Sequence, residues 1–324
     1  MSMAPASFHD LHPTTDDLAT DVLAGFSRVQ KWIPPKYFYD AEGSRLFDAI
    51  TELPEYYPTR TETAMLRAYA DEIAEKAGTG HLLVEPGSGS CTKARILFEG
   101  LQPCAYVPMD ISRDHLRVAA QEVAVEFPWL EVHAACTDFT RLMTLPPSSP
   151  EGRRLAFFPG SSIGNFDPEA AVGFLGMIAD MVGPGGQLLI GVDLKKDKAV
   201  LEAAYDDARG VTAAFNLNLL ARINRELGAD FDLAQWRHKA LYNEAQDRIE
   251  MHLVSRVVQQ VSLLGQTFRF DGGETIHTEN SYKYSVVGFR DLASQAGFTT
   301  DTVWVDDDRL FSLHLLQTGS ADEG

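Results

Sequence analysis

The sequence predicts an α/β protein built on one doubly wound, mostly parallel sheet, with a second, smaller α+β domain. Between residues 60 and 196, short apolar runs alternate with helical patterns, which is typical of parallel strands joined by crossover helices. After Asp193 this alternation stops, and it resumes only at 288–297, before a closing pair of apolar runs. The expected domains are 59–196 plus 286–324, and 1–58 plus 197–285.

Apolar runs predict the strands of the first domain. The five runs expected to pair in parallel are HLLVEP (81–86), AYVPMD (105–110), EVHAACTD (131–138), RLAFFPG (154–160) and GQLLIGVD (186–193). Helical spacing predicts crossover helices over 112–127 and 167–182, where Ser112 and Asp167 stand as capping residues. Two later runs, TTDTVWVDD and RLFSLHLLQT, predict a closing antiparallel pair and bring the sheet to seven strands.

The second domain is predicted from an insertion between the fifth and sixth strands. Residues 197–229 have a helical pattern, and the segments that follow, RIEMHLVSRVVQQVSL, QTFRF and ETIHTENSYKYS, alternate in the manner of antiparallel strands. We expect the N-terminal 58 residues to pack against this insertion.

Composition narrows the class of protein. The net charge of −18, from 46 acidic and 28 basic side chains, repels polyphosphate and disfavours a nucleic-acid partner. No apolar run approaches about 18 residues and the first residues do not resemble a signal peptide, so we expect a cytoplasmic protein without a membrane partner. We also expect a monomer. Cys91, Cys104 and Cys136 are expected as buried free thiols, and no motif predicts a metal site.

The stretch VEPGSGS (84–90) places Gly87 and Gly89 after the first predicted strand. In an open parallel sheet, ligands bind beyond the carboxyl ends of the strands, and glycines allow the backbone to approach a ligand closely. Asp110 ends the second strand, where a carboxylate can accept ribose hydroxyls, and Asp138 with Phe139 ends the third, beside an adenine. Alone, each feature also suits a tight turn or a helix cap; together they favour a nucleoside site.

The spacing of the glycines discriminates among adenosine-containing cofactors. A nucleotide triphosphate loop requires a glycine directly before Lys93, and a dinucleotide loop favours a third glycine where Thr92 stands. S-adenosylmethionine has no phosphates, and acidic residues favour its positive charges. The closing antiparallel pair also resembles the sheet of class I methyltransferases, whereas dehydrogenases usually keep all strands parallel.

Polar residues among aromatic ones predict where a methyl acceptor binds. In FFPGSSIGNF (157–166), Asn165 either contacts a carboxylate or an amine or caps the next helix. Glu279 and Ser281 point to the same face of a strand, which suits either an imidazole or solvent. Four tyrosines are expected to cluster: Tyr37, Tyr39, Tyr56 and Tyr57. They form either part of the hydrophobic core or a cage that binds an alkylated ammonium group.

Long motifs resemble one family along nearly the whole chain. They are PPKYFYDAEGSRLFDAI, LPEYYPTRTE, EPGSGSCTKAR, FFPGSSIGNF, YDDARGVTAAFNLNLLARINRELGADFD, RIEM and HTENSYKYS. The sequence thereby resembles the L-histidine N-alpha-methyltransferases, which form hercynine for ergothioneine biosynthesis. This resemblance implies a class I methyltransferase sheet of Rossmann-like type with a histidine-binding second domain.

The resemblance also implies roles for individual residues. S-adenosylmethionine is expected against Gly87, Lys93, Asp110, Asp138 and Phe139. The histidine carboxylate is expected at Tyr56, Asn165 and Tyr205, its imidazole at Met251, Glu279 and Ser281, and its amino group at Tyr39, the candidate catalytic residue. Asn280 belongs to the same candidate substrate segment, with its role left open. The alternatives are methylation of another amine, such as a tryptophan-derived precursor, a noncatalytic nucleoside-binding protein, or a dehydrogenase.

Overall fold

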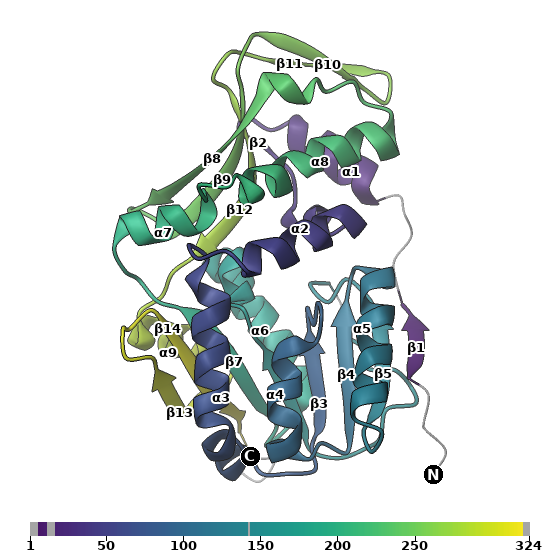
Figure 1. Cartoon of the computed structure of the whole chain (residues 1–324), viewed down its shortest axis with the longest axis vertical. Helices are drawn as coiled ribbons and strands as arrows, with labels where there is room; N and C mark the ends of the chain where they lie inside the picture. Colours follow the sequence, from purple (N-terminus) through teal and green to yellow (C-terminus); the bar gives the residue numbers. More distant parts are fainter. Residues whose placement is uncertain (1–5, 12–16, 142, 320–324) are drawn as a thin grey trace. The chain divides into compact units, whose positions relative to one another are not determined.

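The computed structural model describes residues 6–11, 17–141 and 143–319. The chain forms two compact units (Figure 1). Unit 1 comprises Met1–Pro13, Pro58–Lys195 and Lys283–Gly324, and unit 2 comprises Thr14–Tyr57 and Lys196–Tyr282. Within the described ranges, no helix combines the length and apolar composition needed to cross a membrane.

Unit 1 contains an eight-stranded sheet in the order β1-β5-β4-β3-β6-β7-β14-β13 (Figure 1). Its strands are β1 (Ser7–Asp10), β3 (Leu82–Pro86), β4 (Ala105–Asp110), β5 (Glu131–Cys136), β6 (Arg154–Phe158), β7 (Gln187–Asp193), β13 (Phe298–Val305) and β14 (Phe311–Thr318). β14 runs antiparallel to both β7 and β13, and the remaining neighbours are parallel. The α/β prediction, with five parallel strands and a closing antiparallel pair, is confirmed.

The eighth strand was not expected. β1 pairs in parallel with β5 through Ser7 to Asp10, so these residues lie in unit 1 although the sequence analysis placed all of 1–58 in the second domain. Four residues with the sequence SFHD are too short and too polar to give a strand pattern. The Ser7 Oγ lies 2.8 Å from His133 Nδ1, a contact on the partner strand that only the folded chain provides.

Helices cover both faces of this sheet. α3 (Tyr57–Ala77), α4 (Thr92–Leu101) and α5 (Arg113–Glu126) share one core with strand residues such as Leu83 and Phe157. α6 (Pro168–Val182) lies on the opposite face, where Phe174 contacts Phe158 with 4.9 Å between ring centroids, and α9 (Val286–Gln295) packs beside it. Because the strand order reverses between β3 and β6, the glycine segment after β3 lies at the edge where such sheets bind ligands.

The chain leaves and re-enters unit 1 at adjacent positions. Leu194 forms a parallel bridge with Tyr284, and the Lys195 N–H donates to the Tyr284 carbonyl at 3.0 Å. Beside this bridge, the fully buried Lys283 Nζ lies 2.7 Å from Asp193 Oδ2. The two crossing segments are therefore held together within unit 1.

Unit 2 combines a four-stranded sheet, a hairpin and several helices. The sheet has the order β2-β12-β9-β8, and β10 pairs with β11. Its strands are β2 (Lys31–Trp32), β8 (Trp236–Asn243), β9 (Arg248–Ser255), β10 (Gln259–Leu263), β11 (Gln266–Phe270) and β12 (Thr275–Tyr282). Its helices are α1 (Asp17–Phe26), η1 (Pro35–Phe38), α2 (Ala41–Thr51), α7 (Lys198–Tyr205), α8 (Val211–Leu227) and η3 (Leu233–Gln235).

Segments far apart in sequence meet in unit 2. β2 pairs in parallel with β12, and Asn218 Nδ2 on α8 donates to Asp40 Oδ1, at the start of α2, at 2.8 Å.

One further expectation was wrong in part: all three cysteines are free, but Cys104 is exposed while Cys91 and Cys136 are buried.

Candidate active site

The segment after β3 is shaped by left-handed backbone conformations. Gly87 has φ 70°, Gly89 has φ 50°, and Cys91, at the N-cap of α4, has φ 57°. A Cβ built on Gly87 would lie 3.2 Å from Phe139 Cζ, whereas a Cβ on Gly89 would meet no atom within 4 Å. Gly87 is therefore required both for its conformation and for the close approach of the Phe139 ring, and Gly89 only for its conformation.

Asp110 connects the glycine segment to the end of β4. Its Oδ2 accepts from the Gly89 N–H at 2.9 Å, and its Oδ1 accepts from the Ser112 N–H at 2.8 Å. Burial raises the pKa of Asp110, while these two N–H groups act in the opposite direction. Since each carboxylate oxygen has a second lone pair, Asp110 can hold this loop in place and still accept hydroxyl donors.

Asp138 and Phe139 follow β5 at the same edge of the sheet. The buried Asp138 accepts from the Thr140 N–H at 3.1 Å and from the Thr140 hydroxyl at 2.5 Å, both at Oδ1. The partly exposed Phe139 ring packs beside Gly87. A carboxylate and an aromatic face thus stand next to the glycine segment, as the nucleoside prediction requires.

Glu62 on α3 is a site residue that the sequence analysis missed. It is fully buried, and its Oε2 accepts from Lys93 Nζ at 2.5 Å and from the Gly160 N–H at 2.8 Å. Lys93, predicted to contact the cofactor, is therefore also the counter-ion of Glu62. Glu62 lies in the quoted motif LPEYYPTRTE, but no local spacing relates it to Lys93 or to Gly160.

Glu85 precedes the glycines and is buried with Tyr106, whose hydroxyl donates to its carboxyl group. Burial raises the pKa of Glu85 to about 8, while the Tyr106 hydrogen bond and the charge of Lys93 act in the opposite direction. At neutral pH Glu85 is thus mostly protonated and adds little negative charge to the site.

Asn165 ends the short helix η2 (Ser162–Asn165), which follows β6 in unit 1. Two left-handed residues, Gly160 with φ 82° and Ser161 with φ 55°, direct the chain into this helix. The N-cap of α6 is Asp167, so the alternative interpretation of Asn165 as the cap of that helix is wrong.

Unit 2 contains a connected series of aromatic side chains. Ring centroids lie 5.7 Å apart for Tyr39 and Phe47, 6.4 Å for Phe47 and Tyr56, and 6.1 Å for Tyr56 and Tyr205, each pair at a steep angle. The Tyr205 and Ser281 hydroxyl oxygens lie 2.7 Å apart. Four predicted residues, Tyr39, Tyr56, Tyr205 and Ser281, are therefore neighbours in one unit.

The expected cluster of four tyrosines divides into two groups. The Tyr37 hydroxyl donates to Asp21 at 2.7 Å, and the Tyr57 hydroxyl accepts from Lys196 Nζ at 2.7 Å. Tyr39 and Tyr56 remain with the aromatic series, so they are the two that stay candidates for contact with an amine.

Strand register decides which residues of β12 share a face. Glu279 pairs with Met251 and Ser281 pairs with Ile249, and all four are buried. Paired residues lie on the same face and neighbours along a strand on opposite faces, so Met251, Glu279 and Ser281 share one face while Asn280 lies on the other. We therefore leave Asn280 out of the candidate imidazole site.

The sheet order, the glycine segment and the acidic strand ends of unit 1 define a class I methyltransferase that uses S-adenosylmethionine. Residues 18–318 match the profile of a family described as histidine-specific, S-adenosylmethionine-dependent methyltransferases. The chain belongs to this family.

Curated relatives agree with this membership. The chain is 42% identical to a histidine N-alpha-methyltransferase of Mycolicibacterium smegmatis, over 97% of this chain and 99% of that protein. It is 43% identical to the enzyme of the same name from Mycobacterium tuberculosis, over 92% and 94%. It is 29% identical to ergothioneine biosynthesis protein 1 of Schizosaccharomyces pombe, where 82% of this chain covers 36% of that longer protein.

Proposed function

We propose that this protein transfers three methyl groups from S-adenosylmethionine to the α-amino nitrogen of L-histidine, giving hercynine for ergothioneine biosynthesis. Family membership and the two mycobacterial relatives support the reaction, and the fungal relative supports the pathway. The observation that carries the proposal is the buried face of β12, where Glu279 and Ser281 stand together and the Tyr205 hydroxyl lies against Ser281.

The residues of unit 1 fit the cofactor. Gly87 leaves space that a side chain would fill against Phe139, while Asp110 and Asp138 present carboxylates at adjacent strand ends. When bound, S-adenosylmethionine supplies an electrophilic methyl group attached to a positively charged sulfur. We propose that Asp110 accepts the ribose hydroxyls, that Asp138 and Phe139 contact the adenine, and that Lys93 completes the site.

We propose that unit 2 binds histidine. The Glu279 carboxylate accepts a hydrogen bond from one imidazole nitrogen, and the Ser281 hydroxyl donates one to the other. The Met251 side chain lies beside them on the same face of the sheet. Tyr56 and Tyr205 bind the carboxylate, and Asn165 of unit 1 stays a predicted contact of the same group. An amino acid without the ring cannot form this hydrogen bond to the buried Glu279, which disfavours its binding.

Tyr39 has the proposed catalytic role. Its hydroxyl accepts a hydrogen bond from the amino group and so orients the nitrogen lone pair, because positioning alone contributes much of the rate of such a transfer. The neutral amine needs no covalent attachment to the chain. The rings of Tyr39, Phe47 and Tyr56 then tolerate a trimethylated, permanently charged nitrogen through their π faces.

Mass spectrometry of histidine incubated with protein and S-adenosylmethionine tests the proposal. We expect the mass of three added methyl groups, with fragments that place all of them on the α nitrogen. If calorimetry showed that S-adenosylhomocysteine binds but histidine stayed unmodified, histidine would not be the substrate. If the protein bound NAD and not S-adenosylhomocysteine, S-adenosylmethionine would not be its cofactor. The monomeric state and the cytoplasmic location stay predictions, to be checked by analytical ultracentrifugation and cell fractionation.

A further inference from the structure

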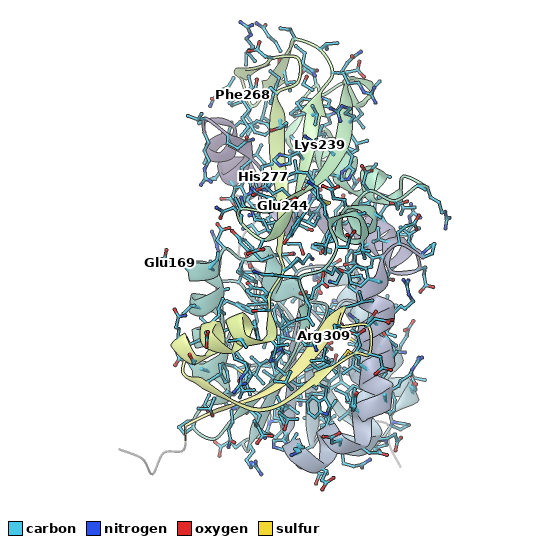
Figure 2. The ribbon with its side chains drawn as sticks, turned by 90° about the vertical axis from the view of Figure 1, so that its left-hand side faces the viewer. Glu169, Lys239, Glu244, Phe268, His277 and Arg309 are labelled. Carbon is cyan, nitrogen blue, oxygen red and sulfur yellow. The ribbon has the colours of Figure 1, made fainter. Side chains whose placement is uncertain are left out.

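The face of the unit 2 sheet opposite Glu279 and Ser281 carries a second group of polar residues. Glu250 and His252 alternate along β9 and so point to the same side, and His277 on β12 is the register partner of His252. Figure 2 shows His277 within this sheet. The proposed function uses none of these three side chains.

The three side chains converge. One ligand atom from each lies within 4.8 Å of the other two, and Glu250 Oε2 lies 3.1 Å from His252 Nε2. The two imidazole rings are stacked at 4.6 Å between centroids and 22° between planes. Zinc bonds of about 2.0–2.1 Å place neighbouring ligand atoms roughly 3.3 Å apart. The Glu250–His252 pair already has this spacing, and the ligand atom of His277 lies within 4.8 Å of both.

Surrounding groups orient these side chains and leave their lone pairs directed into the cluster. Glu250 Oε1 accepts from Arg248 Nη2 at 2.7 Å and from Asn243 Nδ2 at 3.0 Å, so Oε2 is the oxygen turned toward His252. His277 Nε2 lies 3.0 Å from the Glu279 carbonyl, which can only accept, so this nitrogen carries the proton and Nδ1 has the lone pair. The Asn280 side chain also hydrogen-bonds to this ring, and a metal would compete with it. This arrangement matches the second-shell hydrogen bonds of metal-binding histidines.

The surroundings of His252 leave open which of its ring nitrogens carries the proton. Its side chain is more than nine-tenths buried, and its Nδ1 has no hydrogen-bond partner among the described residues. The proton can therefore sit on Nδ1, which leaves Nε2, the nitrogen 3.1 Å from Glu250 Oε2, to bind a cation.

We propose that Glu250, His252 and His277 bind one divalent transition-metal ion of the zinc type, with water in the open position. Two imidazoles and one carboxylate suit zinc, cobalt and nickel better than calcium or magnesium, which prefer oxygen ligands. The absence of a Cys-rich or HExxH motif led the sequence analysis to expect no metal, but two strands distant in sequence supply the ligands here.

The protonation states agree with this ligand set. Burial opposes ionisation of Glu250, yet hydrogen bonds from Asn243, Arg248 and His252 lower its pKa to about 2. Burial, with the charge of His277, lowers the pKa of His252 to about 4, and burial lowers that of His277 as well. At neutral pH the cluster thus offers one carboxylate and two neutral imidazoles, the forms that bind metal. Arg248 and Lys239 are positively charged and reduce its affinity for a cation.

Titration of the full-length, tag-free protein with Co²⁺ tests the site through visible absorption. We expect saturable binding of one equivalent without a thiolate charge-transfer band in the near ultraviolet, and competition by Zn²⁺. Glu250→Gln and His277→Ala should each weaken binding at least tenfold. The matched control is Glu244→Gln, because Glu244 is exposed in the same unit and is not a member of the cluster.

Thermal melting with and without Zn²⁺ gives a second measurement, since metal that ties β9 to β12 should raise the melting temperature of the starting protein but not that of His277→Ala. The absence of saturable binding would overturn the site, as would equal binding by the Glu250 and His277 variants. Both measurements use no histidine and no cofactor, so their failure would leave the proposed methyl transfer untouched.

Discussion

The candidate cofactor residues of unit 1 and the candidate substrate residues of unit 2 are held in place in different ways. In unit 1, Gly87 and Asp138 lie in loops just past parallel strands and Asp110 is the last residue of one, and backbone N–H groups and left-handed residues fix them. In unit 2, Glu279 and Ser281 lie inside a buried strand, and their face is defined by pairing with β9. Loop chemistry thus sets one site and strand register the other, so the two should respond differently to substitution.

The largest expected effect comes from removing the carboxylate of Glu279. Glu279→Ala should lower kcat/KM for histidine roughly 100- to 1000-fold, because a ring held by a buried charged partner loses that partner. Affinity for S-adenosylhomocysteine should stay unchanged by calorimetry. Asn280→Ala is the matched control and should change kcat/KM less than about threefold, since Asn280 lies on the opposite face. Equal effects of the two substitutions would contradict the assignment of Glu279 and Asn280 to opposite faces of β12.

A glycine substitution tests the loop of unit 1. Gly87→Val should weaken binding of S-adenosylhomocysteine by roughly 30- to 100-fold, because φ 70° strains a branched residue and its Cβ would lie 3.2 Å from Phe139. Gly89→Ala should weaken binding no more than about tenfold, since only the conformation costs energy there. Circular dichroism must show both variants folded. A stronger effect at Gly89 would contradict the close-approach role of Gly87.

A single hydroxyl group should have a smaller effect. Tyr39→Phe keeps the ring that packs against Phe47 and removes only the acceptor for the amino group, so kcat should fall about tenfold with little change in KM. Single-turnover measurements separate the three methylations. If kcat were unchanged while KM rose, Tyr39 would contribute to binding and not to orientation of the nitrogen.

The last prediction concerns the pH dependence of stability. The folded protein keeps a proton on Glu85 up to about pH 8, whereas an unfolded glutamate loses it near 4.5. The proton is therefore lost on unfolding, and Glu85 lowers stability by about 1.4 kcal/mol per pH unit as pH rises through this window. Urea unfolding of Glu85→Gln should lack this contribution. The exposed Glu99→Gln serves as control and should retain it. Parallel pH curves for the two variants would reject the raised pKa.

Much of unit 1 was predictable because its signals are local. Apolar runs gave five parallel strands and the closing pair, and alternating glycines located the loop after β3. β1 gave no signal because its four residues are largely polar, and in unit 2 the strand β8 was missed as well. Glu62 was missed because its partner Lys93 lies on another helix, and helical spacing cannot relate them.

Unit 2 was less predictable because its chemistry depends on pairing between distant segments. The shared face of Glu279 and Ser281 follows from strand alternation alone, whereas their position beside Met251 follows only from the register of β12 with β9. That register contains an irregularity between His277 and Glu279, which no sequence pattern indicates. The convergence of His277 with Glu250 and His252 depends on the same pairing.

The adjacent crossing segments at Leu194 and Tyr284 have an architectural consequence. Because these residues are bridged and braced by the buried pair of Lys283 and Asp193, the large sheet needs nothing from residues 196–282 to bring its own neighbouring strands together. The inserted segment therefore begins and ends at one bridged point of unit 1, so its length places no demand on the strand order of that sheet.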